Sequence, residues 1–473
     1  MTNKFSRRNF LKTTAAGAIG SAATLKAKTG LGWIRRRGIN EEPVVGYIGT
    51  GIRYHTALGK GGLKHGPCGG IADVDMLQLG RAIQVAIDMH RSEDRPINVR
   101  GFEDYRSLLD KKDIDVVFIA SPDHWHSKQV IDCMRAGKDV YCEKPVTLTI
   151  REGEQIEKVM EETGRIIQVG TQQRTGFGQR FAKAAAIVQN NRLGKIKQVT
   201  VAIGGSRICE PLPEAAVPRE LNWDLWLGQA PMTKYRSAAE IVDTKGWGAG
   251  HPFSRTHRYY RWFYEYSGGK LTDWGAHHID IALLALGKLK DDIGPIQIQV
   301  EECTHPVEFN EQGMPMRDDQ FNCATAFKVK LTFSDGLVMY VRHSAQEDLG
   351  FDNGIMFEGE KGRILVNRGK LVGRPVEELD KNPLPPDWYF QLMGQSLPKS
   401  HIDNFIDCVR DRKQPISDMK SHNLMLNVCH AINIAMRLNR KLTFDPKSRN
   451  FGSDELANSL VSREQRKGFE VIA

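Results

Sequence analysis

The sequence predicts an α/β domain built on a parallel, doubly wound sheet, followed by an α+β domain with a large open, mostly antiparallel sheet. Three observations support this fold class. The chain has 473 residues, which suits two domains better than one. Short apolar strands alternate with helical patterns in its first folded part. In its second part, several strands alternate strictly between apolar and polar residues.

The first domain is expected to span residues 43–167. The run 114–120 is apolar throughout, as in a strand buried on both faces of a parallel sheet. Residues 76–89 carry apolar side chains at helical spacing. Strands that alternate with helices form a parallel sheet with helices on its faces. The other elements of this domain are expected as strands at 44–48, 71–73, 140–142 and 166–169 and as helices at 126–136 and 150–163.

The second domain is expected to span residues 168–440, with a C-terminal tail at 441–473. Residues 327–333 alternate in polarity, and the chain returns over 337–341 after a Ser-Asp-Gly turn, which predicts a hairpin with one apolar face. Such a sheet is covered on one side, and a cleft between two domains of this kind is where ligands tend to bind. Further strands are expected at 296–300, 355–357 and 364–366, and helices at 401–412 and 420–438.

The formal net charge of +9 comes from the N-terminal segment. Residues 1–40 contain nine Lys and Arg residues and no Asp or Glu, which leaves 57 basic against 57 acidic residues in the rest of the chain. A neutral body does not offer the basic face that binding to nucleic acid requires. We therefore expect no nucleic-acid partner.

Residues 1–42 are expected to form a twin-arginine export signal and a linker. The string SRRNFLK at 6–12 precedes a mildly apolar run, 13–25, that is too short for a membrane span of about 20 residues. We expect a protein that is periplasmic or otherwise exported by this route, with transient membrane contact through the signal. Because no clear cleavage site is present, an uncleaved signal that tethers the protein to the membrane stays open, as does a disordered basic tail.

The eight cysteines show no C-x-x-C or other metal-type spacing, so we expect mostly buried thiols. His401, His422 and His430 have no carboxylate at ligand spacing and are expected to be structural. We therefore propose no metal.

A Gly-x-Gly turn, Gly49 to Gly51, follows the first strand and would let backbone N–H groups approach a pyrophosphate. Tyr54 stands where this fingerprint has a third glycine, so its side chain should push the helix away from the strand or reshape the loop. Asp73, at the end of the second strand, can accept hydrogen bonds from an adenosine ribose and repels a 2′-phosphate. NAD is therefore favoured over NADP, and an ordinary turn without a nucleotide is the alternative.

Glu143-Lys144-Pro145 follows a buried strand at the carboxyl edge of the sheet, where ligands of open α/β sheets bind. A lysine beside a nicotinamide ring would be a strong donor to a carbinol or carbonyl oxygen. Taken alone, this tripeptide would indicate only a lysine in a surface turn.

Asp273, His277 and Asp280 recur at offsets of four and three, so one helical face should carry all three. A histidine beside a carboxylate can act as an oriented general base, although a satisfied core histidine is the alternative. His278 points about 100° away on a helix and is expected to be structural.

These motifs, together with SPDHWH at 121–126 and with Gly268 and Gly269 before Asp273, occur in an order that resembles the Gfo/Idh/MocA oxidoreductases over residues 43–440. The leader and LNWDLWLG at 221–228 are similar to the exported branch of that family. The resemblance implies a Rossmann domain, then a domain with an open sheet often used to form oligomers, so we expect a homo-oligomer. It also implies catalytic roles for Lys144, Asp273 and His277, and cofactor contacts at Gly49, Gly51, Ile52, Asp73, Ser121, Pro122, His126 and Glu143. For His126, a histidine near the start of a helix that packs on the sheet is the alternative.

The segment before the glycines is crowded with aromatic and basic side chains, Arg258, Tyr259, Arg261 and Trp262. Aromatic faces and fork-shaped donors suit a sugar ring with its hydroxyls, so we expect a small carbohydrate substrate to bind these four residues. Packing between the domains is the alternative.

The implied function is nicotinamide-dependent oxidation of a secondary alcohol of a sugar or cyclitol. In this hypothesis His277 takes the hydroxyl proton, Lys144 stabilises charge on the oxygen, and Asp273 orients His277 or a neighbouring hydroxyl. An exported enzyme should hold its cofactor tightly and recycle it, because free NAD is scarce outside the cytoplasm. The alternatives are a redox-neutral, NAD-dependent glycoside hydrolase, lyase or epimerase, and a sugar-binding or assembly protein without turnover.

Overall fold

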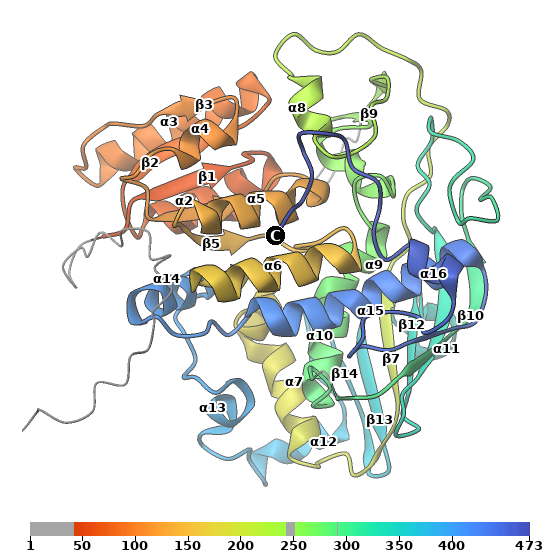
Figure 1. Ribbon diagram of the computed structural model, residues 1–473. Coiled ribbons are helices and arrows are strands. Elements are labelled where there is room, and N and C mark those ends of the chain that lie inside the picture. The colour runs from red at the N-terminus through yellow and green to blue at the C-terminus, as the bar shows by residue number, and fades with distance from the viewer. Residues whose placement is uncertain (1–41, 243–250, 291) are drawn as a thin grey trace, which may run out of the picture. The chain divides into compact units, whose positions relative to one another are not determined.

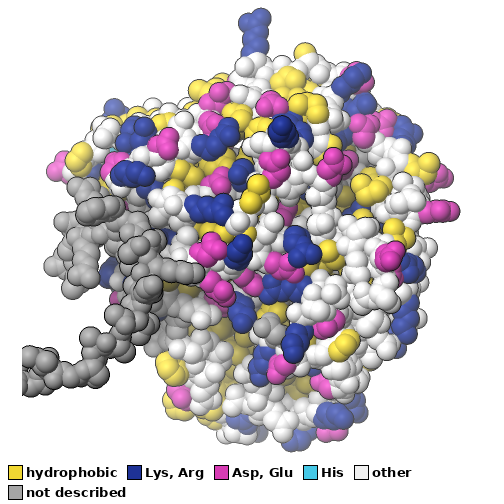
Figure 2. Space-filling model, in the orientation of Figure 1, with side chains coloured by type: hydrophobic (Ala, Val, Ile, Leu, Met, Phe, Trp, Pro, Cys, Tyr) yellow, Lys and Arg dark blue, Asp and Glu magenta, His cyan; other side chains and the backbone are white. Residues whose placement is uncertain are grey.

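The computed structural model describes residues 42–242, 251–290 and 292–473. The expected leader, 1–42, therefore lies outside the described residues except for Glu42. None of the helices in the described ranges has the length and hydropathy that a membrane-spanning segment requires. Figure 2 shows acidic and basic side chains interspersed over the face in view, without a large area of one sign.

A six-stranded sheet forms the first domain, with the strand order β3-β2-β1-β4-β5-β6 (Figure 1). Every neighbouring pair runs parallel, as the alternation of strands and helices predicted. The central strands are buried along their whole length, because helices cover both faces. The strands are β1 Val45–Ile48, β2 Cys68–Ala72, β3 Gly101–Phe102, β4 Val116–Ile119, β5 Asp139–Cys142 and β6 Ile167–Val169.

Three helices of this domain begin at a residue whose side chain accepts a hydrogen bond from a free backbone N–H group. Asp75 caps one helix by accepting from the N–H groups of Leu77 and Gln78, and Thr149 caps another by accepting from that of Glu152. Gly164 ends the latter helix in a left-handed conformation. The helices are α2 Gly59–Leu63, α3 Met76–Ser92, α4 Tyr105–Leu109, α5 Asp123–Arg135 and α6 Ile150–Thr163.

Tyr54, at the position of the missing third glycine, reshapes the start of the first helix. Residues Tyr54–Leu58 form a π-helical turn, η1, before α2 begins. The Tyr54 ring is buried edge-to-face against Tyr47, 5.1 Å between ring centres, and its hydroxyl donates to the Ala82 carbonyl at 3.1 Å. A Cβ at Gly59 would lie 2.8 Å from the Tyr54 ring, and one at Gly62 would lie 2.9 Å from Phe118. The close packing that the third glycine would permit is therefore supplied further along the helix.

An eight-stranded sheet forms the second domain, in the order β15-β14-β13-β7-β12-β11-β10-β16. Only the β7–β12 pair is parallel, so the expected open, mostly antiparallel sheet is confirmed. The predicted hairpin is the β11–β12 pair. The strands are β7 Ile196–Ile203, β10 Ile296–Thr304, β11 Ala326–Thr332, β12 Val338–Arg342, β13 Asn353–Gly359, β14 Gly362–Val366, β15 Leu371–Val372 and β16 Leu442–Phe444.

Helices α7, α10 and α15 cover one face of this sheet and bury its apolar side chains (Figure 1). Along β11 the inward side chains are buried and the intervening ones half-exposed, which is the pattern of a sheet covered on one side. Helix α15 also lies beside α6 of the first domain, so it packs on both domains. These helices are α7 Arg180–Gln189, α10 Gly275–Ala285 and α15 Met419–Leu438.

The last segment of the chain, expected as a tail, takes part in both domains. Strand β16 pairs with β10 at the edge of the eight-stranded sheet, and Val471 packs into the core of the first domain. The remaining elements are η2 Gln172–Arg174, η3 Phe177–Gln179, α8 Trp223–Leu227, β8 Ser237–Val242, β9 Pro252–Ser254, η5 His257–Trp262, α9 Gly269–Asp273, α11 Gln346–Leu349, α12 Arg374–Glu377, η6 Glu378–Asp380, α13 Trp388–Met393, α14 His401–Asp411 and α16 Glu455–Ser459.

All eight cysteines are free thiols, and all but the half-buried Cys303 are buried, as expected. The three late histidines are buried, and two of them hydrogen-bond: His401 to Thr175 and the Val169 carbonyl, and His430 to Thr147. Within the described residues no group of His, Cys, Asp or Glu side chains could hold a metal ion.

Stability should fall on mild acidification because several buried histidines resist protonation. Burial lowers the pKa of His124 and His422 to about 3, and that of His278, His401 and His430 to about 4. In the unfolded chain these side chains bind protons near pH 6.5, so the unfolded state is favoured as pH falls from 6.5 towards 4.

Thermal unfolding between pH 7.5 and 4.5 should therefore show a progressive loss of Tm that begins above pH 5.5. In His430→Gln the unfolding free energy should depend less steeply on pH, by up to about 1.4 kcal/mol per pH unit for the one proton removed. An unfolding free energy that stays constant from pH 6.5 to 5 would contradict this account of the histidines.

Candidate active site

One cavity of about 650 Å³ opens at the carboxyl ends of the parallel strands. Its walls are the loops that follow β1, β2, β4 and β5 on one side, and η5, α9 and α10 of the second domain on the other. This position and size are those of ligand sites in open α/β sheets.

The glycine turn lies against this cavity as expected. Gly49 adopts a φ of +79°, and a Cβ there would collide with the backbone of Ser121. A Cβ at Gly51 would meet no atom within 4 Å, so the backbone at Gly51 is open to the cavity. Ile52 follows the turn and also lines the cavity. A pyrophosphate group can therefore approach the backbone here, which is what a dinucleotide requires.

Asp73 lies beside the glycine turn and shapes it. Its Oδ2 accepts from the Thr50 backbone N–H at 2.6 Å and from the Thr50 hydroxyl at 2.8 Å, and its Oδ1 accepts from Asp75 N–H at 2.9 Å. Burial raises the pKa of Asp73, and these hydrogen bonds oppose that effect. Since each carboxylate oxygen has two lone pairs, the group can still accept from a ribose hydroxyl in the cavity.

The loop after β4 contributes Ser121, Pro122 and His126 to the cavity wall. The two ring nitrogens of His126 contact the Pro145 carbonyl at 2.7 Å and the Ser121 carbonyl at 2.9 Å. His126 thus connects the loop after β4 with the loop that carries Lys144.

Glu143 lines the cavity beside Lys144. It accepts from Arg53 Nε at 2.7 Å and from Gln172 Nε2 at 3.0 Å, so its charge is paired.

Lys144 and Asp273, which come from different domains, form an ion pair in the cavity. The Lys144 ammonium donates to Asp273 Oδ1 at 2.5 Å and to the Asp273 carbonyl at 2.9 Å. Burial alone would raise the pKa of Asp273, but Lys144, Arg261 and Lys270 hold it well below its usual range. Asp273 is therefore ionised.

His277 also lines the cavity, four residues after Asp273. Burial first, and then the positive charges of Lys144 and Arg368, lower the pKa of His277 well below its ordinary value. Its Nδ1 has no hydrogen-bond partner among the residues that the structure describes. A neutral imidazole in this position can accept a proton.

Of the three residues expected on one helical face, Asp273 and His277 both line the cavity, whereas Asp280 does not. The helix is interrupted at Trp274, between α9 and α10, and Asp273 bonds to Lys144 rather than to His277. Asp280 is fully buried in a two-pronged ion pair with Arg174, at 2.6 and 2.9 Å. His278 contacts Gln173 and Asn353, which confirms that it is structural.

The four predicted substrate residues lie on η5, and three of them reach the cavity: Arg258, Arg261 and Trp262. The expectation for Tyr259 is wrong. Its ring is fully buried between Phe253 and Phe321, with 4.5 and 6.0 Å between the ring centres. Tyr259 therefore packs in an aromatic cluster behind the cavity.

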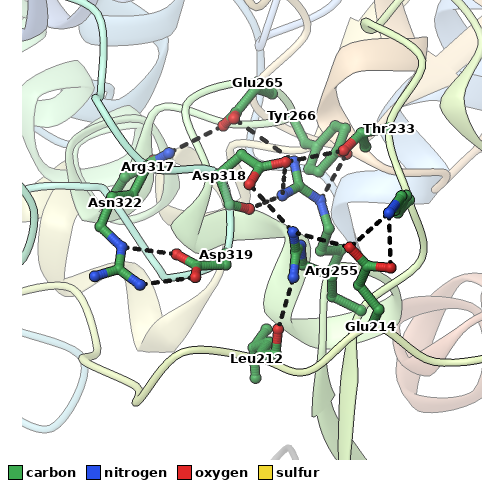
Figure 3. A network of polar contacts seen from close by, with 12 residues as sticks. Leu212, Glu214, Thr233, Arg255, Glu265, Tyr266, Arg317, Asp318, Asp319 and Asn322 are labelled. Atoms are coloured by element: carbon green, nitrogen blue, oxygen red, sulfur yellow. Dashed lines mark hydrogen bonds and ion pairs between the residues drawn. The ribbon is translucent and has the colours of Figure 1, made fainter.

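A network of ion pairs fixes the chain on either side of η5 (Figure 3). Arg255 is buried, faces Glu265 at 3.6 Å and Asp318 at 3.9 Å, and lies over the ring of Phe263 with 4.6 Å to its centre. Arg317 pairs with Asp319 at 2.8 Å close by. These contacts hold the segment that carries Arg258 and Arg261 in place.

Several cavity residues were not predicted from the sequence. Tyr260 donates to Asp123 at 2.8 Å across the domain boundary. Lys270 and Trp274 stand inside the glycine motif, so their place in it was an available signal. Arg368 comes from the turn between β14 and β15, and no local pattern marks it.

Removing the carboxylate beside the glycine turn should change which dinucleotide binds. In Asp73→Ser the affinity for NAD should fall about tenfold, because the ribose loses a hydrogen-bond acceptor. The ratio of the affinities for NAD and NADP should fall by about tenfold or more, because the negative charge that repels a 2′-phosphate is also lost. Titration of both dinucleotides into nucleotide-free protein measures this, with Asp88→Ser, an exposed carboxylate on α3, as the control. Unchanged discrimination in Asp73→Ser would remove the carboxylate from the ribose site.

Comparison with known proteins finds relatives that match this chain over part of its length. An uncharacterised oxidoreductase of Bacillus subtilis, YrbE, is 30% identical over 148 residues, which cover 31% of this chain and 42% of that protein. A glycosyl hydrolase family 109 protein of Shewanella pealeana is 31% identical over 179 residues, 34% of this chain and 38% of that protein. The chain thus spans about two fifths of the length of these curated relatives.

Solved structures share the fold at low sequence identity. The WlbA dehydrogenase of Chromobacterium violaceum, solved with NADH and UDP-GlcNAcA, is 17% identical in sequence and superimposes with a TM-score of 0.56. The match covers 86% of this chain and 97% of the WlbA chain. An aldose–aldose oxidoreductase of Caulobacter crescentus, solved with glycerol, is 18% identical with a TM-score of 0.52, and covers 85% and 99%.

Family descriptions match both domains. Residues 72–171 match the NAD-binding Rossmann fold of an oxidoreductase family, in agreement with the open backbone at the glycine turn and with NAD as the expected cofactor. Residues 206–471, more than half of the chain, match the C-terminal α/β domain of the same family. With its two sheets, its glycine turn and its Lys144–Asp273 pair, the chain belongs to the Gfo/Idh/MocA oxidoreductase family.

Proposed function

We propose that this protein is an NAD-dependent oxidoreductase that acts on a secondary alcohol of a sugar or cyclitol. The observation that carries the proposal is that Lys144 and His277, from different domains, line the same cavity as the open backbone of the glycine turn. Trp262 and Arg261, on the wall that the second domain forms, offer an aromatic face and a guanidinium group, which suit a polyhydroxylated ring.

The chemistry divides between the cofactor and the protein. When NAD is bound, its nicotinamide ring can accept a hydride from the carbinol carbon. His277, kept neutral by its burial and by the positive charge of Lys144, takes the hydroxyl proton. Lys144 stabilises the charge that develops on the oxygen. Asp273 keeps the Lys144 ammonium in position through their ion pair, so its role here is to position Lys144 rather than to orient His277.

We further propose that the protein is exported by the twin-arginine route and retains its cofactor. The SRRNFLK string supports export, and the scarcity of NAD outside the cytoplasm supports retention with recycling in place. Anchoring through an uncleaved signal is compatible with the same sequence. The half-exposed face of the eight-stranded sheet offers a surface for a homo-oligomer.

A redox-neutral reaction is the second candidate function. The 31% identity to glycosyl hydrolase family 109 proteins favours it. Transient oxidation acidifies the C–H bond next to the new carbonyl, so elimination or epimerisation can follow before the hydride is returned. The same lysine and histidine serve both routes. A sugar-binding protein without turnover would not need this arrangement of a neutral histidine beside a charged lysine.

Changes at the two reacting side chains should impair chemistry rather than cofactor binding. Lys144→Ala and His277→Ala should each slow reduction of bound NAD by about 10²-fold or more, because each removes a group that acts in the transition state. Their NAD affinity should change less than about tenfold. Single-turnover absorbance at 340 nm and NAD titration measure the two effects, with Lys381→Ala, an exposed lysine, as the control. Full turnover in both variants would overturn the assignments.

The neutral state of His277 makes the pH dependence specific. Since its pKa lies below the ordinary value of 6.5, the base form persists at mildly acidic pH. The acidic limb of kcat/KM should therefore lie below pH 6.5 and should vanish in His277→Ala. An acidic limb at pH 7 or above would assign the base to another group.

A retained cofactor should stay bound through purification and gel filtration and be released by denaturation. Protein purified without added NAD, once denatured, should release close to one nicotinamide dinucleotide per chain, identified by absorbance and mass. Protein that carries none, and that loses added NAD on gel filtration, would contradict retention.

The products distinguish the two routes. Net oxidation gives a free keto sugar, whereas the redox-neutral route gives a cleaved glycoside or an epimer and no change in the total amount of reduced cofactor. Mass spectrometry of the products from a panel of sugars and glycosides decides between them.

A further inference from the structure

Near Lys144 and Asp273 the cavity wall carries basic side chains that form no ion pair with the described residues. Lys144 and Asp273 neutralise each other, as do Arg53 and Glu143. Three further cations, Arg261, Lys270 and Arg368, line the same cavity and form no ion pair within the described ranges. Asp273 and the buried Asp123 lie near Arg261, so Lys270 and Arg368 are the two cations of interest.

Arg368 is held by aromatic rings rather than by an acid. Its guanidinium lies over Phe177 and over Trp274, with 4.6 and 4.4 Å to the ring centres. Its Nε is buried and has no hydrogen-bond partner among the described residues. Stacking occupies the faces of a guanidinium and leaves its in-plane N–H donors to form hydrogen bonds. Arg368 thus presents fixed donors to a ligand.

Lys270 shares one of these rings. Its ammonium lies 5.7 Å from the centre of the Trp262 ring and 5.9 Å from that of Trp274, and the described residues offer it no hydrogen bond. Burial lowers the pKa of Lys270, Asp273 opposes this, and Arg261 adds to it. An arriving anion would relieve the repulsion between these cations.

The two cations flank the interruption between α9 and α10, because both contact Trp274, which stands between Asp273 and His277 in the chain. They belong to the second domain, whereas the glycine turn that suits a pyrophosphate belongs to the first. An anion held by them would therefore be part of the substrate rather than of the dinucleotide.

We propose that the substrate is an acidic carbohydrate whose carboxylate or phosphate binds Lys270 and Arg368 while a secondary hydroxyl of the same molecule meets Lys144 and His277. The contact of the hydroxyl with Lys144 and His277 rests on the proposed function, whereas the binding of the anion by Lys270 and Arg368 does not. Guanidinium and ammonium groups bind both kinds of oxyanion, so the shared requirement is a negative charge on the sugar.

Calorimetric titration of the NAD-saturated full chain tests the anion requirement without relying on turnover. The ligands are hexuronates, their uncharged methyl esters, hexose 6-phosphates and the parent hexoses. At least one acidic sugar should bind tenfold or more tightly than its neutral counterpart, and the difference should shrink in high salt. Which acid binds best, uronate or phosphate, identifies the natural group. Equal affinities for every acidic and neutral pair, or no binding by any acid, would overturn the proposal.

Variants then assign the preference to these residues. Arg368→Gln and Lys270→Gln should each lose tenfold or more in affinity for the acid and less than threefold for the neutral sugar, whereas Arg368→Lys should recover part of the loss. Lys370→Gln, an exposed lysine on the same turn, is the matched control and should keep the wild-type preference. Variants that weaken NAD but leave the preference for the acid intact would assign the two cations to the cofactor and overturn the proposal.

Hydride transfer separates this inference from the proposed function. Bound NAD that is reduced equally well by acidic and neutral sugars, in wild type and variants alike, would overturn the inference and leave the oxidoreductase in place. An acid that binds through Arg368 but never reduces the nicotinamide would support the inference and remove the proposed function.

Discussion

The active-site arrangement depends on one ion pair, between Lys144 and Asp273, that joins the two domains inside the cavity. Each partner is largely removed from water, so the loss of either one leaves a poorly solvated charge. The pair keeps Asp273 ionised, and the lysine helps to lower the pKa of His277. A single contact thus couples the placement of the domains to the protonation states of Asp273 and His277 on which the proposed chemistry depends.

Other polar contacts hold the same boundary. Asp123, at the start of α5, accepts from Tyr260 and from Ser267 of the second domain, at 2.8 and 2.5 Å. Arg174 and Asp280 form a fully buried pair behind the site. Each charged or hydroxyl group in these contacts has a partner, which is what a buried polar network needs in order to specify one arrangement. By contrast, Lys270 and Arg368 contact aromatic rings and form no ion pair with the described residues, and this difference is the basis for proposing that they bind a ligand.

Many of the longer elements follow from local pattern, although β7 and α7 were not among those predicted. The parallel strands, the hairpin of β11 and β12, and helix α6 with the bounds 150–163 could be read from polarity and spacing, because burial on one or both faces dictates that spacing. The strands β3 and β15 could not be predicted, since two residues are too few to show an alternation of apolar and polar side chains. The glycine turn was also predictable, because a ligand that approaches the backbone at a strand end needs small residues there. The place of Lys144 was implied by the resemblance of the whole set of motifs to the family, since its own tripeptide would have indicated only a surface turn.

The sequence by itself determined the order of the domains and the carboxyl edge of the parallel sheet as the place of the cavity, and it marked Lys144 and His277, which both line that cavity. Only the tertiary structure decided which charges meet. It turned Asp280 away to Arg174, placed Tyr259 in an aromatic cluster, and brought Arg368 to Trp274 from a turn almost a hundred residues later. Helical spacing says which residues share a face, but the partner that a charge finds depends on which elements pack together. Packing is set by the whole chain, and so no local pattern contains it.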